Sequence, residues 1–116
     1  MTELTLRDRI KTIQNEIAKG NLHPTRSAQI LSELSALYGN VNDEITKRQL
    51  NYQRKLLEEL EKDQSTKKAE LISQTSEEYR FFKEAKDTQE LVKEMIRSQK
   101  YLIRAYEEEY KQSKNQ

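Results

Sequence analysis

The chain has 116 residues, of which 34% are hydrophobic and 35% are charged. So few apolar residues suit long amphipathic helices better than a compact globule, and two glycines and one proline leave little turn chemistry for a multi-stranded sheet. The formal net charge of +1 is too small for the whole protein to act as a polycation, so any attraction to nucleic acid must come from a local cluster.

The chain has no cysteine and a single histidine, His23. Disulfides, thiolate metal sites and Cys/His or Ser/His catalytic groups therefore have nothing to build on, and no glycine-rich phosphate loop is present. No apolar run approaches the ~20 residues of a membrane span, and no signal-peptide core follows Met1. We expect one soluble, cytoplasmic, all-α domain (1–116) that is not an enzyme and needs no metal or cofactor.

The first helix is predicted over residues 5–19. Thr5 and Asp8 have the spacing of a capping box, and Gly20 followed by Asn21 supplies the left-handed stop that ends such a helix. Between them the apolar residues recur at helical spacing, which gives one apolar stripe: Leu6, Ile10, Ile13 and Ile17.

A second helix is predicted over residues 24–62, because Pro24 suits a first helical turn. An apolar stripe marks its length: Ile30, Leu34, Leu37, Val41, Ile45, Tyr52, Leu56 and Leu60. Gly39 and Asn40 interrupt the sequence, but the stripe stays in phase across them, so one long helix is favoured over two separate helices. His23 precedes this helix and is interpreted as a loop residue at its start rather than as a titrating switch.

A polar turn then leads to a helix over residues 66–74, which Ser65 can cap. Thr75 and Glu78 have the spacing of another capping box, so the last helix is predicted over residues 76–111. Two long helices joined by a short connection form an antiparallel, coiled-coil-like hairpin with the short N-terminal helix beside it. Because such a hairpin has a thin core, we expect a homo-oligomer.

The last helix carries an apolar stripe and, beside it, a line of cations. The stripe consists of Leu91, Met95, Leu102 and Tyr106, widened by Val92, Ile96, Ile103 and Tyr110. The cations recur at spacings of four, three and four, which places them along one side of the helix: Lys93, Arg97, Lys100 and Arg104.

The cation line has two interpretations. It is either an anion-binding face or a solvated face in which neighbouring acids pair with the cations: Glu90 with Lys93, Glu94 with Arg97, and Glu108 with Arg104. Tyr101 lies at its border, and an aromatic ring beside cations is the combination that single-stranded nucleic acid uses. A packing role for Tyr101 is an equal alternative. Basic character continues in Arg80, Lys83 and Lys86.

The remaining aromatic and acidic residues favour structural roles. Tyr38, Tyr52, Phe82 and Tyr106 fall on apolar stripes and are predicted to pack in the core. Two runs of carboxylates are typical of solvated helix faces rather than of acid–base catalysis: Glu58, Glu59 and Glu61, and Glu107, Glu108 and Glu109.

The segment Ile96-Arg97-Ser98-Gln99-Lys100-Tyr101, followed by an aliphatic-basic helix that ends in acids, resembles the phage UvsY-type recombination mediators. More broadly, the chain is similar to small helical proteins of tailed phages, and the resemblance covers about residues 45–110. It implies an all-helical oligomer that binds single-stranded DNA and helps load a RecA-type recombinase onto DNA covered by single-strand-binding protein, in the host cytoplasm if phage-encoded. The resemblance assigns the family's DNA-binding role to four residues of this chain: Arg97, Ser98, Lys100 and Tyr101.

The leading hypothesis is therefore an accessory protein of phage-type recombination or replication that binds single-stranded DNA through Lys93, Arg97, Lys100 and Arg104, with Tyr101 as a stacking platform. The alternative is a helical interaction module, either a structural part or an inhibitor of a host protein, that binds no nucleic acid.

Overall fold

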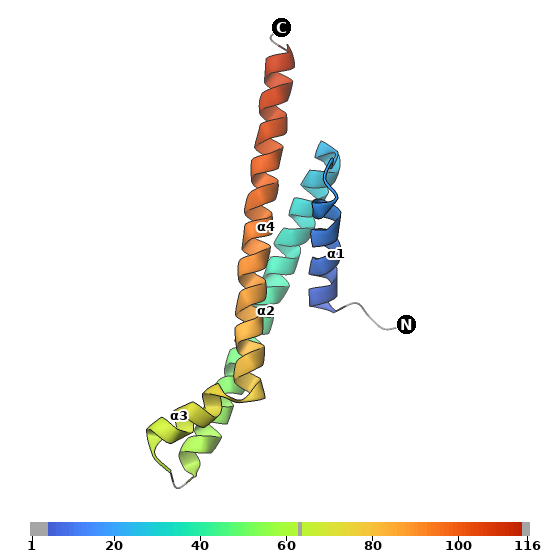
Figure 1. Cartoon of the computed structure of the whole chain (residues 1–116). Helices are drawn as coiled ribbons and strands as arrows, with labels where there is room; N and C mark the ends of the chain where they lie inside the picture. The colour runs from blue at the N-terminus through green and yellow to red at the C-terminus, as the bar shows by residue number, and fades with distance from the viewer. Residues whose placement is uncertain (1–4, 63, 115–116) are drawn as a thin grey trace. The chain divides into compact units, whose positions relative to one another are not determined.

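The structure is a computed structural model that describes residues 5–62 and 64–114. These residues form no strand, and the helices follow one another along the chain as α1 (Leu6–Ala18), α2 (Pro24–Glu61), α3 (Thr66–Gln74) and α4 (Glu77–Lys114) (Figure 1). The two long helices, α2 and α4, run antiparallel to each other. The predicted all-α class and the antiparallel hairpin with a short N-terminal helix are confirmed.

The chain divides into two compact units, which are described separately. Unit 1 comprises residues 1–39 and 90–116, and so contains α1, the first part of α2 and the last part of α4. Unit 2 comprises residues 40–89, and so contains the remainder of α2, all of α3 and the first part of α4.

Both ends of α1 follow the predicted chemistry. The Thr5 hydroxyl accepts the backbone N–H of Asp8 at 3.1 Å, and the Asp8 carboxylate accepts the backbone N–H of Thr5 at 3.3 Å. At the other end, Gly20 and Asn21 both have left-handed backbones, with φ of 74° and 56°. Because L side chains rarely adopt this conformation, glycine and asparagine are the residues that can stop the helix there.

Helix α2 is continuous through Gly39, so the favoured prediction of one long helix is confirmed. His23 starts it: the His23 carbonyl accepts the backbone N–H of Ser27 at 3.0 Å, and its ring Nδ1 accepts the backbone N–H of Thr25 at 3.2 Å. The histidine therefore caps a helix N-terminus, a more definite role than the loop position predicted for it.

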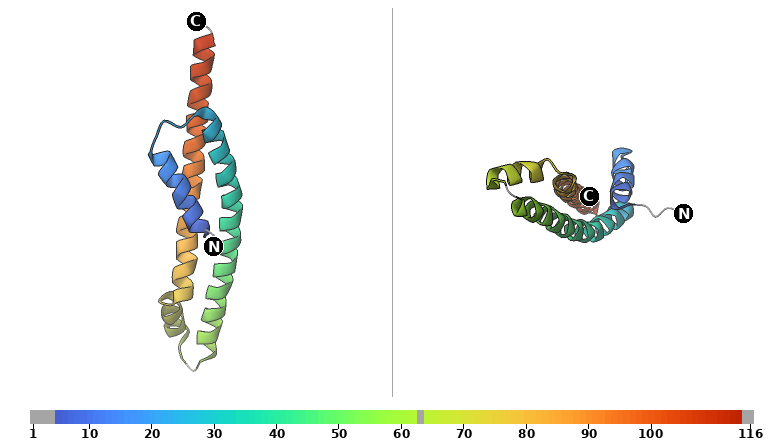
Figure 2. Two further views of the ribbon diagram at one scale, coloured as in Figure 1. Left: turned by 90° about the vertical axis from the view of Figure 1, so that its right-hand side faces the viewer. Right: turned by 90° about the horizontal axis from the view of Figure 1, so that it is seen from below.

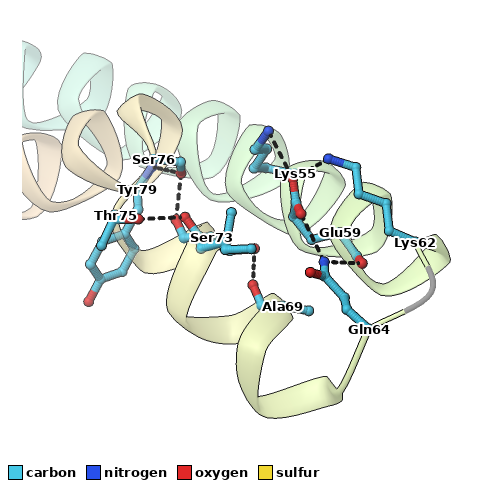
Figure 3. Close-up of polar contacts among 10 residues, drawn as sticks. Lys55, Glu59, Lys62, Gln64, Ala69, Ser73, Thr75, Ser76 and Tyr79 are labelled. Carbon is cyan, nitrogen blue, oxygen red and sulfur yellow. Dashed lines mark hydrogen bonds and ion pairs between the residues drawn. The ribbon is translucent and has the colours of Figure 1, made fainter.

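The junction between α3 and α4 differs from the prediction. Ser65 caps α3 as expected, but Thr75 ends α3, because its hydroxyl donates to the carbonyl of Ile72 at 2.9 Å. Ser76 caps α4 instead and accepts the backbone N–H of Tyr79 at 3.2 Å (Figure 3). The predicted capping box of Thr75 with Glu78 is therefore wrong by one residue. Helix α4 also continues to residue 114, beyond the predicted end at 111.

In unit 1, α1 packs beside the first part of α2 (Figures 1 and 2). Arg26 of α2 holds Glu16 of α1 with a hydrogen bond of 2.8 Å from its Nη2, and also reaches Glu33 at 3.1 Å. The Tyr106 hydroxyl of α4 donates to the carbonyl of Leu22 at 2.7 Å. The buried apolar side chains of this unit are Ile10, Ile13, Ile30, Leu34, Leu37, Val92 and Met95.

Two polar side chains are buried among them. Gln99 is 1% exposed and Ser27 is fully buried, and within the described part of the chain neither Gln99 Oε1 nor Ser27 Oγ has a hydrogen-bond partner. Gln99 falls on the heptad spacing of Ala85, Val92 and Tyr106. The apolar stripe predicted for α4 is thus rotated, since Leu91 and Tyr110, which were assigned to it, are exposed.

In unit 2 the buried apolar side chains are few and mostly small: Val41, Ala69 and Ala85. Half-buried rings add to this core, with Tyr52 4.9 Å from Tyr79 and 6.0 Å from Phe82 between ring centroids. Gln89 of α4 donates to Asn42 of α2 at 2.7 Å, which fixes the antiparallel register of the two helices in this unit.

Glu59 is 2% exposed, although the acidic run that contains it was predicted to be solvated. Its carboxylate accepts from Lys62 at 2.8 Å and from Gln64 at 2.9 Å, and lies 3.3 Å from Lys55 (Figure 3). These contacts satisfy the buried charge and tie the end of α2 to the connection that follows. The neighbouring Leu60, predicted to be in the apolar stripe, is exposed instead.

Candidate nucleic-acid interface

A groove of about 640 Å³ lies on the surface of unit 1 between α2 and α4. Two of its lining residues, Ser35 and Tyr38, come from α2. The others come from α4: Lys93, Ile96, Arg97, Lys100, Tyr101 and Arg104. They include the four predicted cations and the predicted stacking ring of Tyr101, whereas Ser98, which the resemblance also implied, is exposed and does not line the groove. The four-three-four spacing of the cations brings them to one helix face, and the antiparallel packing supplies the opposite wall.

The cations differ in their pairing. Lys93 lies 3.4 Å from Glu90 and Arg97 lies 2.8 Å from Glu94, so two of the predicted pairs form. Among the described residues, neither Lys100 nor Arg104 has an ion pair, and the predicted contact of Arg104 with Glu108 is absent. Both existing pairs join exposed side chains, which makes them weak and easily exchanged for another anion.

The groove also carries aromatic and apolar surface. Tyr101 is 74% exposed and lies in the wall of the groove, so it is not part of the core of unit 1. Tyr38, predicted to be a core residue, is half-buried in the opposite wall, and Ile96 of α4 is a half-buried aliphatic residue of the groove lining. A ring in each wall and an aliphatic side chain in the groove are suited to flat, partly apolar groups such as nucleobases.

The additional cations of α4 that lie in unit 2 are occupied with their own neighbours. Arg80 pairs with Glu77 at 3.4 Å and stacks 5.1 Å from the centroid of the Phe81 ring. Lys83 lies over the Tyr79 ring at 5.7 Å. Lys86 lies over the Phe82 ring at 5.3 Å, so each of these three cations contacts an aromatic ring of its own unit, and Arg80 also has ion pairs.

The shifted pKa values belong to structural contacts away from the groove. Hydrogen bonds from Lys62 and Gln64 lower the pKa of Glu59 to about 2. The hydrogen bond from Arg26 lowers the pKa of Glu16, and the reciprocal bonds raise the pKa of Arg26. Each of these charges is held by a specific partner, so they serve helix connections rather than proton transfer.

The described residues contain no cluster of three or more histidine or acidic side chains arranged to hold a metal ion. Of the helices in this part of the chain, none combines the length and the apolar character that crossing a bilayer requires.

Comparison with protein families, curated proteins and solved structures finds no match for the chain. The resemblance to the UvsY-type mediators therefore stays a prediction that rests on the residues quoted for it.

Sequence reasoning missed the α2 wall of the groove. Ser35 carries no signal of its own, and Tyr38 falls on the helical spacing of the apolar stripe, where a core position is the natural interpretation. The register of α2 against α4 decides which residues face the cation line, and that register comes from packing and not from either helix alone.

Proposed function

We propose that this protein is a non-enzymatic accessory factor of phage-type DNA recombination or replication that binds single-stranded DNA in the unit 1 groove. The observation that supports this most is the gathering of Lys93, Arg97, Lys100, Tyr101 and Arg104 around one groove. The narrower role, loading a RecA-type recombinase onto DNA covered by single-strand-binding protein, rests on the resemblance alone.

In this proposal the cations bind phosphates and the two tyrosines contact bases. The line from Lys93 to Arg104 spans ~16 Å of helix, so one groove holds only a few nucleotides. Single-stranded DNA suits the site better than duplex, because Tyr101 and Tyr38 can stack only on bases that are not paired within a helix. A homo-oligomer would repeat the groove, and its weak contacts would then combine along one strand.

Salt dependence of binding tests the electrostatic part. Log Kd for a single-stranded oligonucleotide should rise with log salt at about 2.8 per protomer if all four cations contact phosphates. The slope should be about 1.4 if only Lys100 and Arg104 do so. Fluorescence anisotropy over a series of salt concentrations measures it. A salt-independent Kd, or an unchanged Kd after Arg97→Ala with Lys100→Ala, contradicts the proposal.

A second variant should raise the affinity for DNA instead of lowering it. Glu90→Gln with Glu94→Gln removes the acids that pair with Lys93 and Arg97 and leaves the groove itself unchanged. DNA affinity should increase and the salt slope should move toward the upper value. A decrease in affinity would show that the acids take part in binding.

The alternative function, a helical protein-interaction module that binds no nucleic acid, is favoured by a different observation. Unit 2 exposes four leucines: Leu50, Leu57, Leu60 and Leu71. Tyr101→Ala separates the two functions. If the groove binds DNA, this variant loses affinity for the oligonucleotide at constant oligomer mass. If the chain is an interaction module, the wild type binds no oligonucleotide, and Tyr101→Ala loses mass or partner binding where the groove is the contact.

A further inference from the structure

Three of the exposed leucines of unit 2 lie together on one face of α2. Leu50, Leu57 and Leu60 fall within ~80° of one another around the helix axis, at 3.6 residues per turn. This leucine face points away from the side of α2 that holds Tyr52 and Glu59. Half-buried Leu56 joins it to the core.

The leucine face is large in relation to the core of its unit. Among the described residues of unit 2, the buried apolar side chains are Val41, Ala69 and Ala85, whereas Leu57 alone is 59% exposed. Leucines that recur at heptad spacing on the outside of a helix are typical of a surface that packs against another helix.

Charges along the same stretch of α2 are separated by sign. Residues 47–55 contain four cations and no acid, and residues 58–61 contain three acids and no cation. Arg48 and Lys55 pair within the chain, and so does Glu59. Lys47 and Glu61 are exposed at the two ends of the leucine face, and neither has an ion pair among the described residues.

We infer that the leucine face of α2 is a self-association surface on which a second copy of the chain packs antiparallel. In this arrangement Leu50 of each copy lies beside Leu60 of the other, Leu57 lies near the two-fold axis, and Lys47 of each copy lies beside Glu61 of the other. Parallel pairing would instead bring the basic stretches together and the acidic stretches together, so the charges select the antiparallel arrangement.

The first test compares two leucines of nearly equal exposure. Leu57→Glu places two charges in the contact, one from each copy, because the two-fold axis repeats the substitution. It should raise the dimer dissociation constant ~100-fold or more. Leu71→Glu is the control, since Leu71 is 57% exposed but lies on α3 outside the leucine face. Sedimentation velocity without DNA measures both, and circular dichroism verifies that each variant remains helical.

The second test exchanges charges. Lys47→Glu alone and Glu61→Lys alone should each weaken the dimer, and the double variant should restore it, because only antiparallel pairing places these residues opposite each other. A wild type that stays monomeric at every concentration, an equal effect of Leu71→Glu and Leu57→Glu, or a double variant weaker than either single one would each overturn the inference. None of these outcomes depends on whether the groove binds DNA.

Discussion

Replacing Gln99 by methionine should stabilise the protein. The side chain is 1% exposed and its Oε1 has no partner among the described residues, so folding removes this oxygen from water without replacing its hydrogen bonds. An unsatisfied buried acceptor costs about 1–3 kcal/mol. Methionine keeps the length and the unbranched shape of glutamine and leaves no polar atom unsatisfied. The free energy of unfolding of Gln99→Met should therefore exceed that of the wild type by about 1–3 kcal/mol.

Urea denaturation followed by far-ultraviolet circular dichroism measures this difference. The midpoint should rise while the slope m stays constant, because the surface exposed on unfolding hardly changes. Gln89→Met is the matched control. Gln89 donates to Asn42 at 2.7 Å, so its replacement should lower the free energy of unfolding by about 0.5–1.5 kcal/mol. A Gln99→Met protein that is no more stable than the wild type would refute the reasoning and show that Gln99 is satisfied in solution.

Three further predictions concern helix ends, the core and acid. Gly20→Ala should destabilise the protein by about 1–2 kcal/mol, because the φ of Gly20 is +74°. Gly39→Ala should stabilise the protein by about 0.5–1 kcal/mol, because Gly39 lies in a helix interior with open space around it. Thermal unfolding measures both changes. Leu34→Ala should lower the free energy of unfolding by about 2–5 kcal/mol in urea, since the side chain is fully buried; a loss well below this would mean that the site collapses around the smaller residue. The pKa of Glu59 falls from 4.5 to about 2 on folding, so its contribution is complete above pH 4.5 and disappears as the pH falls toward 2. The stability difference between the wild type and Glu59→Gln should shrink over this range in urea titrations, and a constant difference would contradict the assignment.

The sequence by itself determined the helices and several of their ends, although not the junction of α3 with α4 or the end of α4. The signals for these helices act within a few residues of one another, so local chemistry is sufficient to place the helices. They are the helical spacing of apolar residues, the caps formed by Thr5 with Asp8 and by Ser65, and the stop formed by Gly20 with Asn21. The cation line of α4 was predictable for the same reason: residues spaced three and four apart share a face whatever surrounds the helix.

Only the tertiary structure decided which faces are covered. Two stripes are possible on α4, and a small rotation of the helix converts one into the other. One includes Leu91 and Tyr110, and the other is centred on Val92 and Gln99. Packing within unit 1 buries the second. Packing within unit 2 buries Glu59 rather than Leu60, and packing within unit 1 brings Tyr38 to the wall of the groove. Burial depends on residues far apart in the chain, and for that reason the periodicity of a single helix could not specify it.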